Sequence, residues 1–383
     1  MINDAEPMGI YIHIPFCLKK CDYCDFYSLP LTRVSLLEDY TRSLINELKL
    51  RKLELEHPVA SIYLGGGTPS LLQPEQVERI LSAVFAAYPT QGKIEISMEM
   101  NPATVNLNKL KGFKSAGVTR MSVGVQSFSD RELKLLGRIH DASESATALR
   151  CVRQAGFTNF SLDLIYGLPG QTWSDWRGNL SRAVEFEPQH ISAYLLELEP
   201  ATPLARKIET GIISPLDDDR EAGLYYNMLD YLQEQGYLHY EISNFARPGR
   251  ECRHNLLYWQ SRPYLGFGCG AVSFNDQQRY INQPPVDFYM EALRDNRVPP
   301  VAILETMDAQ ARLVDAVIMG LRLTRGINCT DFQCRWGIDL LQKYQDIISG
   351  CQTRGLLELE NDRIYLTKKA YFLSNQVLCE FFS

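Results

Sequence analysis

The chain has 383 residues, a length that fits two domains, or one barrel with an additional domain, at ~150 residues per domain. Apolar residues make up 45% and charged residues 22%, which excludes a wholly disordered or fibrous chain. The formal net charge is −7 and both signs are mixed along the chain, so nucleic acid is not an expected partner.

The first residues, MINDAEPM, lack the basic and apolar regions of a signal peptide. No run approaches the ~20 apolar residues of a membrane span, so a cytoplasmic location is expected. Of the ten cysteines, three lie between positions 17 and 24. This spacing favours a metal site over a secreted disulfide framework.

Short apolar runs rich in β-branched and aromatic residues predict six strands in the first 200 residues. They lie at 9–15, 61–67, 95–100, 121–126, 161–167 and 191–198. Segments with helical periodicity separate them, for example 37–52 and 173–184. This alternation predicts an α/β fold with a parallel sheet, either a partial (βα)6 barrel of the TIM type or a doubly wound sheet.

Polar and glycine-bearing segments follow these strands, at 15–24, 65–70, 99–102, 126–128 and 166–169. In a parallel barrel the C-terminal ends of the strands share one face, and active sites lie there. We therefore expect these segments to converge in space.

The C-terminal part has another pattern. From about Thr306, three helices, a hairpin in LLELENDRIYLT and a final apolar helix predict a winged-helix-like domain. Residues 301–383 carry nine Lys or Arg and ten Asp or Glu, whereas a DNA-binding domain should show a basic face. Packing or protein contact is therefore favoured over a DNA-binding regulator.

Cys17, Cys21 and Cys24 form a C-x3-C-x2-C triplet directly after the first predicted strand. A structural zinc site takes four ligands, and Asp25 and Phe26 follow in place of a fourth cysteine. Three thiolates suit an iron–sulfur cube that leaves one iron open. Zinc with a distant fourth ligand, and three unpaired thiols, are the alternatives.

The segment YIHIPFCLKKCDYC resembles the cluster loop of the radical S-adenosylmethionine (SAM) superfamily. Within it, GGGTPS from position 65, EMNP from 99, GVQSF from 124, GRIH from 137 and DLIYGLP from 163 resemble the oxygen-independent coproporphyrinogen oxidase group. The resemblance implies a partial (βα)6 radical-SAM barrel. It also implies a 4Fe-4S cluster on Cys17, Cys21 and Cys24, with SAM on the open iron.

The same resemblance implies residues that contact SAM. They are Tyr11, Tyr23, Gly66, Gly67, Thr68, Glu99, Gln126, Arg138 and Asp163. For the glycines, which let a backbone approach a ligand closely, the alternative is a tight strand-to-helix turn. For the charged residues the alternative is an internal ion pair, for example Arg138 with Asp163.

The segment HNLLYW, from His254 to Trp259, resembles the HNxxYW motif of the sister group, the HemW-type heme chaperones. Histidine is an axial ligand of heme iron, and Tyr258 and Trp259 could pack on a porphyrin face. His254 is therefore the heme candidate. The further candidates are His13, His140 and His239; a capped turn with two core aromatics is the alternative reading.

Three features differ from the oxidases. Phe26 stands where they carry a further cysteine, only ten residues precede Tyr11, and Glu197 stands near the place of a small residue beside their second SAM. The resemblance therefore implies a heme chaperone that binds heme, a 4Fe-4S cluster and SAM and transfers heme to an acceptor. The alternative is an oxygen-independent coproporphyrinogen III oxidase of porphyrin biosynthesis, so enzymatic activity is left open.

The expected partners are a heme acceptor protein, for which a membrane hemoprotein is one candidate, and an electron donor. Contact with the membrane would then be transient and made through the acceptor. The expected division of the chain is a radical-SAM barrel over 1–245, a linking region with HNLLYW over 246–300, and a winged-helix-like domain over 301–383.

Overall fold

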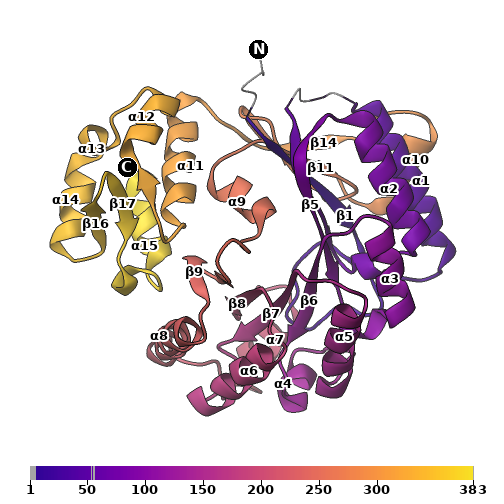
Figure 1. The fold of residues 1–383 in the computed structure, drawn as a ribbon, viewed down its shortest axis with the longest axis horizontal. Coiled ribbons are helices and arrows are strands. Elements are labelled where there is room, and N and C mark those ends of the chain that lie inside the picture. The colour runs from indigo at the N-terminus through magenta and orange to yellow at the C-terminus, as the bar shows by residue number, and fades with distance from the viewer. Residues whose placement is uncertain (1–5, 53, 55–56, 383) are drawn as a thin grey trace.

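The computed structural model describes residues 6–52, 54 and 57–382. Its centre is a twelve-stranded sheet in the order β14-β13-β12-β11-β1-β4-β5-β6-β7-β8-β10-β9 (Figure 1). The six predicted strands are adjacent and parallel: β1 (Met8–Ile14), β4 (Val59–Gly66), β5 (Thr90–Met100), β6 (Arg120–Gln126), β7 (Phe160–Tyr166) and β8 (His190–Leu195). They follow chain order without reversal, and the two edge strands do not pair with each other. The prediction of a partial (βα)6 barrel is confirmed.

Helices cover the outer face of this sheet (Figure 1). They are α1 (Ser35–Leu50), α2 (Pro74–Ala87), α3 (Leu107–Ser115), α4 (Asp130–Leu135), α5 (Ala142–Gln154) and α6 (Trp173–Glu185). Each long helix turns an apolar stripe inward; in α1 it contains Leu37, Leu44 and Leu48, all buried. The opposite, concave face of the sheet remains for polar side chains and ligands.

Residues 246–300, expected as a linking region, contribute to the same sheet. β11 (Tyr264–Phe267) pairs in parallel with β1, and β12 (Val272–Phe274) and β13 (Gln278–Asn282) continue the sheet in antiparallel fashion. β14 (Val301–Thr306), just beyond this region, pairs antiparallel with β13 and also belongs to this sheet. The HNLLYW segment lies in α9 (Arg253–Trp259), which contacts β1 and β4. A further helix, α10 (Val286–Arg294), packs on α1.

Smaller elements complete the barrel. β2 (Phe16–Cys17) and β3 (Leu29–Pro30) pair across the base of the cysteine loop. After β8 come α7 (Pro203–Glu209), α8 (Asp218–Glu234), β9 (Leu238–Glu241) and β10 (Asn244–Ala246), and β10 pairs antiparallel with β8. Single 3-10 turns lie at Pro69–Leu71, Pro102–Thr104, Lys368–Ala370 and Glu380–Phe382.

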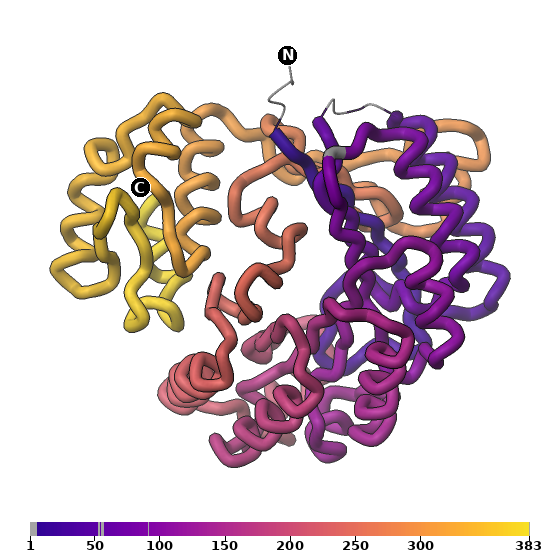
Figure 2. The backbone as a smooth tube through the Cα atoms, in the orientation of Figure 1, coloured from indigo at the N-terminus to yellow at the C-terminus, as the bar shows by residue number. Residues whose placement is uncertain are grey.

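The C-terminal region has a hydrophobic core of its own, which includes Val317, Leu340 and Leu366. Its elements are α11 (Ala309–Leu321), β15 (Ile327–Asn328), α12 (Cys329–Trp336), α13 (Leu340–Lys343), α14 (Gln345–Thr353), β16 (Leu357–Glu360), β17 (Arg363–Leu366) and α15 (Ser374–Cys379). β16 and β17 form the predicted hairpin in a three-stranded sheet, as in a winged helix. This region lies opposite the concave face of the barrel, and α9 lies between them (Figures 1 and 2).

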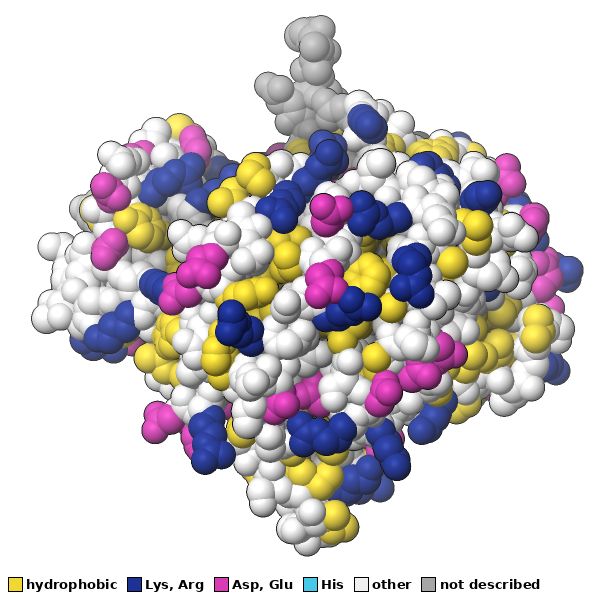
Figure 3. Space-filling model, turned by 60° about the horizontal axis from the view of Figure 1, so that its bottom comes forward, with side chains coloured by type: hydrophobic (Ala, Val, Ile, Leu, Met, Phe, Trp, Pro, Cys, Tyr) yellow, Lys and Arg dark blue, Asp and Glu magenta, His cyan; other side chains and the backbone are white. Residues whose placement is uncertain are grey.

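None of the described helices is long and apolar enough to cross a membrane. Residues 1–5 lie outside the described residues. They are part of the N-terminal segment that lacks the pattern of a signal peptide. On the face shown in Figure 3, Lys and Arg side chains alternate with Asp and Glu. That face therefore presents no single-sign surface for a nucleic acid.

Candidate functional site

A cavity of about 590 Å³ opens where the parallel strands end, and we call it the cofactor pocket. Its wall contains every predicted cluster and SAM residue except Tyr11: Cys17, Cys21, Tyr23, Cys24, Gly66, Gly67, Thr68, Glu99, Gln126, Arg138 and Asp163. The segments that carry these residues thus converge, because parallel strands bring their C-terminal ends to one face.

The cysteine loop is held at its base by the backbone. The Leu29 amide donates to the Pro15 carbonyl at 2.7 Å, and the Leu31 amide donates to the Cys17 carbonyl at 2.8 Å. Two side chains from outside the cysteine loop donate to cysteine sulfurs: Thr68 Oγ1, after β4, to Cys17 at 3.5 Å and Arg138 Nη1, after α4, to Cys21 at 3.4 Å. Donors of this kind stabilise thiolates, the form in which cysteine binds metals.

The three thiols do not form a compact single-ion site. Across residues 6–52, 54 and 57–382, no three His, Cys, Asp or Glu side chains are placed so that they could hold one metal ion. A preformed zinc site, which needs four convergent ligands, is therefore absent from this part of the chain. The cysteine sulfurs that hold an iron–sulfur cube need not meet at one atom, because each cysteine binds a different iron.

Two positions at the end of β4 and directly after it need glycine. Gly66 has a φ of 115°, and a Cβ there would lie 2.7 Å from the His13 ring. At Gly67 a Cβ would lie 2.7 Å from the Phe16 carbonyl oxygen and 3.0 Å from the Cys17 sulfur. The glycines thus let the backbone of this segment lie directly against the cysteine loop.

Two acids of the cofactor pocket, Glu99 on β5 and Asp163 on β7, are buried together. Glu99 accepts hydrogen bonds from Tyr63 Oη at 3.0 Å and the Gly66 amide at 3.1 Å; Ser122 Oγ donates to Asp163 at 3.0 Å. Burial, and then the charge of Asp163, raise the pKa of Glu99 to about 7, and burial raises the pKa of Asp163. A cation between them would favour both carboxylates, and SAM carries an ammonium and a sulfonium.

Arg138 supplies positive charge in the wall of the same pocket. Its Nη2 donates to the Gly124 carbonyl at 2.7 Å, and its buried Nε has no hydrogen-bond partner among the residues described. Within those residues it forms no ion pair with Asp163, the alternative considered above. A guanidinium with a free donor can bind a ligand carboxylate. Nearby, Gln126 ends β6 at a φ of 67°, a strained conformation of the kind found at binding sites.

The two predicted tyrosines lie in different places. Tyr23 lines the cofactor pocket. The hydroxyl of Tyr11 instead bonds to His13 Nδ1 at 3.0 Å, and its ring stacks on Tyr63 with the centroids 6.3 Å apart. Tyr11 therefore reaches the cofactor pocket only indirectly, through Tyr63 and its bond to Glu99.

His254, the heme candidate, lies in the core and is 1% exposed. Its Nδ1 bonds to Ser61 Oγ and its Nε2 to Tyr258 Oη, both at 2.8 Å, and its ring stacks on Tyr63. Burial lowers its pKa to about 3, so the ring is neutral. Both nitrogens are engaged, and His254 could bind iron only after Ser61 or Tyr258 is displaced.

The other candidate histidines are engaged in a similar way. The Nε2 atoms of His13, His140 and His239 bond to backbone carbonyls at 2.9, 3.1 and 3.2 Å. Burial lowers the pKa of each ring, to about 4 for His140 and His239. Each ring is thus a neutral core group in this conformation.

Comparisons with known proteins agree with this geometry. The Radical SAM superfamily model matches residues 11–183, and the HemN C-terminal domain model matches residues 307–373. The chain is 32% identical to heme chaperone HemW of Lactococcus lactis, over 98% of this chain and 97% of the relative. It is also 32% identical to heme chaperone HemW of Bacillus subtilis, over 97% and 98%. The chain belongs to the HemW family.

A solved structure shows that the fold of this HemW family member is shared more widely. Coproporphyrinogen III oxidase HemN from Escherichia coli superposes with a TM-score of 0.85, over 98% of this chain and 90% of that one. At 23% sequence identity, this likeness concerns the fold. It includes the barrel, the strands after α9 and the C-terminal region.

Several residues of the pocket wall were not predicted from the sequence. Tyr63 lies in the predicted strand 61–67, two residues after Ser61 and on the same face, a pattern that could have revealed it. Arg120 begins β6, is 2% exposed, and has an Nε without a partner among the described residues. A charged residue at the start of an apolar strand was the available signal, because burying it needs a compensating group.

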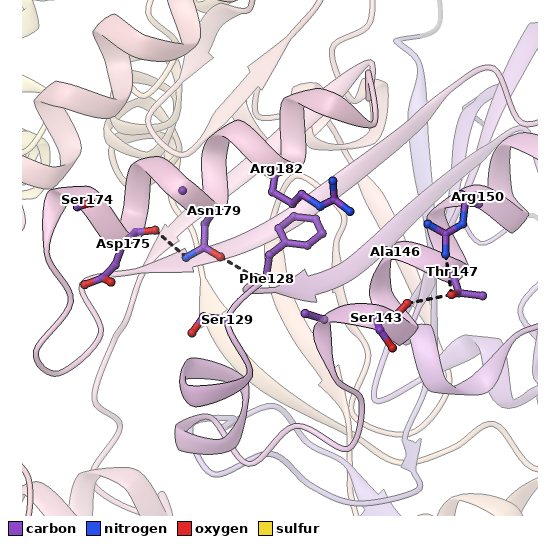
Figure 4. A pocket seen from close by; sticks show the side chains of 12 residues that line it. Phe128, Ser129, Ser143, Ala146, Thr147, Arg150, Ser174, Asp175, Asn179 and Arg182 are labelled. Carbon is purple, nitrogen blue, oxygen red and sulfur yellow. Dashed lines mark hydrogen bonds between the residues drawn. The ribbon is translucent and has the colours of Figure 1, made fainter.

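A separate surface pocket, of about 570 Å³, lies outside the barrel between α5 and α6 (Figure 4). Its side chains mostly bond to one another: Asn179 accepts from the Phe128 amide at 2.6 Å, and Arg150 donates to Thr147 at 2.9 Å. None of the predicted site residues of this HemW family member lines it, and it has no part in the function proposed below.

Proposed function

We propose that this chain is a heme chaperone, which holds heme as cargo and passes it to an acceptor protein. Similarity to heme chaperone HemW over nearly the full length carries the proposal. The HNLLYW segment supports it, because α9 places Tyr258 and Trp259 beside a second cavity next to the cofactor pocket.

The radical SAM superfamily implies a 4Fe-4S cluster and SAM. We assign the cluster to Cys17, Cys21 and Cys24, whose thiols face the cofactor pocket with donors on two of them. When bound, the cluster supplies the electron that cleaves a sulfur–carbon bond of SAM.

The other residues of the cofactor pocket would hold SAM. Glu99 and Asp163 would face its cationic groups, and Arg138 its carboxylate. Gly66, Gly67 and Thr68 would provide a close backbone surface, Gln126 a polar contact and Tyr23 an aromatic wall. Tyr11 would act on the site only indirectly, through Tyr63. The free Nε of Arg138 and the two acids of raised pKa support this assignment.

The alternative, an oxygen-independent coproporphyrinogen III oxidase, is not favoured. Phe26 occupies the position of the further cysteine and is 67% exposed at the mouth of the cofactor pocket. The full-length relatives bear the name heme chaperone HemW, whereas the similarity to HemN is 23% in sequence.

We further propose the setting in which the chaperone acts. It would work in the cytoplasm, receive electrons from a reductant protein, and meet a membrane hemoprotein as acceptor. We also propose three units: the barrel over 1–245, a segment over 246–300 that closes the concave face, and a C-terminal domain over 301–383.

An anaerobic assay on cluster-reconstituted protein tests the function. Heme is added in an optical titration, and in parallel coproporphyrinogen III is incubated with SAM and a reductant. We expect stoichiometric heme binding without decarboxylation. Decarboxylation over many turnovers, or no heme binding, would contradict the proposal.

A further inference from the structure

The cofactor pocket contains polar side chains that the SAM assignment does not use. Beyond the residues assigned to SAM, its wall continues along β6 and β8, the start of α9 and the C-terminal region. We call this part the inner wall, and its residues include Arg120, His190, Arg322, Tyr371 and Asn375. A second ligand beside SAM could therefore contact both the barrel and the C-terminal region.

Arg120 lies deep on the concave face of the barrel. It pairs in register with Ser97 of β5, and Ser122, two residues later on the same face, bonds to Asp163. Arg120 is therefore further from the C-terminal ends of the strands than the acids that would face SAM.

The guanidinium of Arg120 carries a buried charge without an ion-pair partner. Arg120 is 2% exposed, its Nη1 bonds to the Arg250 carbonyl at 3.5 Å, and its Nε has no hydrogen-bond partner in the part of the chain that the structure describes. In that part it forms no ion pair either; Glu95, whose charge acts on it from further away, accepts from the Arg253 amide at 3.0 Å. A buried charge of this kind favours a negatively charged ligand.

His190 adds a second donor to the inner wall. Its ring is 1% exposed, and burial together with the charge of Arg120 lowers its pKa, so the ring is neutral. Its Nε2 bonds to the Tyr240 hydroxyl at 2.9 Å, and that hydroxyl accepts from the Cys252 amide at 3.4 Å. The hydroxyl hydrogen is thus free to point at Nε2, which places the proton of the neutral ring on Nδ1. Nδ1 has no partner among the described residues, so it is a buried donor without an acceptor.

Arg322 brings a second positive charge, from the C-terminal region. It follows α11, and its guanidinium lies over the Trp259 ring, 5.0 Å from the centroid. Its Nη1 bonds to Asn375 Oδ1 at 3.3 Å, whereas its buried Nε has no partner within residues 6–52, 54 and 57–382. Glu241 lies within range of its charge but accepts from Asn244. Arg322 thus keeps a donor free for a ligand.

The charges of the whole cavity indicate what such a ligand carries. SAM would account for Glu99, Asp163 and Arg138, because its cationic groups would face the acids and its carboxylate the arginine. The other charged residues of the wall apart from Arg120 and Arg322 are partly or fully exposed to water, which screens them: Lys19, Lys20, Asp25, Glu197 and Glu199. Arg120 and Arg322 therefore call for two negative charges. Since they belong to different parts of the fold, two separate acid groups suit them better than one compact anion.

We propose that the cofactor pocket binds a second small molecule beside SAM, a dicarboxylate whose acid groups contact Arg120 and His190 on the barrel and Arg322 on the C-terminal region. Guanidinium groups bind carboxylates through paired hydrogen bonds, and Nδ1 of His190 adds a further donor. The site rests on the SAM assignment proposed above and is independent of heme binding.

The test is titration calorimetry of the cluster-reconstituted, SAM-saturated protein with malonate, succinate and glutarate, which differ in the spacing of their carboxylates. We expect one molecule of the best dicarboxylate per chain, bound at least about tenfold more tightly than acetate or inorganic phosphate, because each of these presents only one acid group. Similar affinities for all five would show an adventitious ion only and overturn the proposal, as would preferred binding of phosphate or no binding of any dicarboxylate.

Two variants locate the dicarboxylate. Arg322→Gln and His190→Phe should each weaken its binding about tenfold, since each removes a donor. Arg182→Gln, which changes an exposed arginine of α6, is the control and should leave the affinity unchanged. Retained cluster absorbance and SAM affinity show that each variant is folded.

The two hypotheses fail in different ways. If the unchanged protein does not bind SAM, the SAM assignment is wrong. If it binds SAM, but Arg322→Gln and His190→Phe bind the dicarboxylate as well as Arg182→Gln does, the inner wall is not the site and this inference is wrong. If His190→Phe does not fold, the comparison of Arg322→Gln with Arg182→Gln decides alone.

Discussion

At the scale of single residues, the cofactor pocket is a balance of buried charges. Its wall contains Glu99 and Asp163 together with Arg138, whose Nε has no hydrogen-bond partner among the described residues. Uncompensated buried charge is costly, and burial accordingly raises the pKa of Glu99 to about 7 and raises the pKa of Asp163. A zwitterionic ligand with additional positive charge, such as SAM, would restore the balance.

The raised pKa of Glu99 predicts that SAM binding depends on pH. Below pH 7 the acid is protonated, and binding a cation requires that the proton leave. SAM affinity should therefore rise with pH, by up to about tenfold per unit between pH 5.5 and 7, and level off above. In Glu99→Gln this slope should disappear. Titration calorimetry of SAM binding at several pH values measures it.

The exposed Glu197, also in the pocket wall, gives the control for this experiment. Glu197→Gln should keep the slope of the unchanged protein, because that carboxylate is surrounded by water. A slope that persists in Glu99→Gln would assign the titrating group elsewhere.

The cluster assignment predicts the effect of removing single thiols. Cys21→Ser should abolish the iron–sulfur absorbance of reconstituted protein, since a cube that already leaves one iron open would lose a second ligand. Cys151→Ser, on the outer helix α5, should leave it intact. Optical spectra and iron content report the result, and equal losses in both variants would refute the assignment.

The sequence was informative about these residues where a strand ends. Glu99, Gln126 and Asp163 were assigned to SAM through the family resemblance of their motifs, and the prediction that the segments after the strands converge agreed with it. Hydrogen-bond partners such as Tyr63 and Ser61 were not predicted, because they depend on which strands become neighbours. The burial of His254 was not predicted either, because the six residues of the motif do not show which sheet their helix packs against.

At the scale of elements, the loop after β4 and the cysteine loop pack backbone to backbone. Gly67→Ala places a methyl group 2.7 Å from the Phe16 carbonyl, so the loops must separate. SAM affinity of the reconstituted protein should fall by at least about tenfold, because the close surface of the loop is lost. Isothermal titration with SAM measures the loss.

An exposed glycine inside α6 provides the contrast. At Gly178 an added Cβ meets nothing within 4 Å. Gly178→Ala should therefore stabilise the protein by about 0.5–1 kcal/mol in urea unfolding and leave SAM affinity unchanged. If both alanine variants behaved alike, the close contact at Gly67 would have no functional consequence.

The position of His254 in α9 predicts how its replacement changes the heme affinity. His254→Ala should weaken heme binding about tenfold, since a buried hydrogen bond to Tyr258 is worth ~1–3 kcal/mol when its partner is removed. Tyr258→Phe should weaken it similarly, and the double variant should be no worse than either, because the two residues act as one unit.

The visible spectrum of bound heme separates positioning from iron binding in these variants. A positioning role for His254 predicts that the spectrum remains unchanged in His254→Ala while the affinity falls. A changed Soret band would instead identify His254 as an axial ligand that reaches the iron after α9 rearranges.

At the scale of the whole molecule, the C-terminal region and α9 cover the concave face of an open barrel. The six parallel strands could be predicted from the sequence, because each is an apolar run separated from the next by a helix. β11 to β14 could not, since they are three to six residues long and only β11 joins them to the barrel, by pairing with β1 across most of the chain. Both cavities lie where these distant segments meet.

The most direct test of the account is whether heme and SAM occupy the protein together. Cluster-reconstituted protein is saturated with SAM and titrated anaerobically with heme, and bound SAM is measured after separation of the free ligands. We expect one heme per chain with SAM fully retained, because Tyr258 and Trp259 line a cavity other than the cofactor pocket. Release of SAM in proportion to the heme bound would show that the two ligands share one cavity and would contradict it.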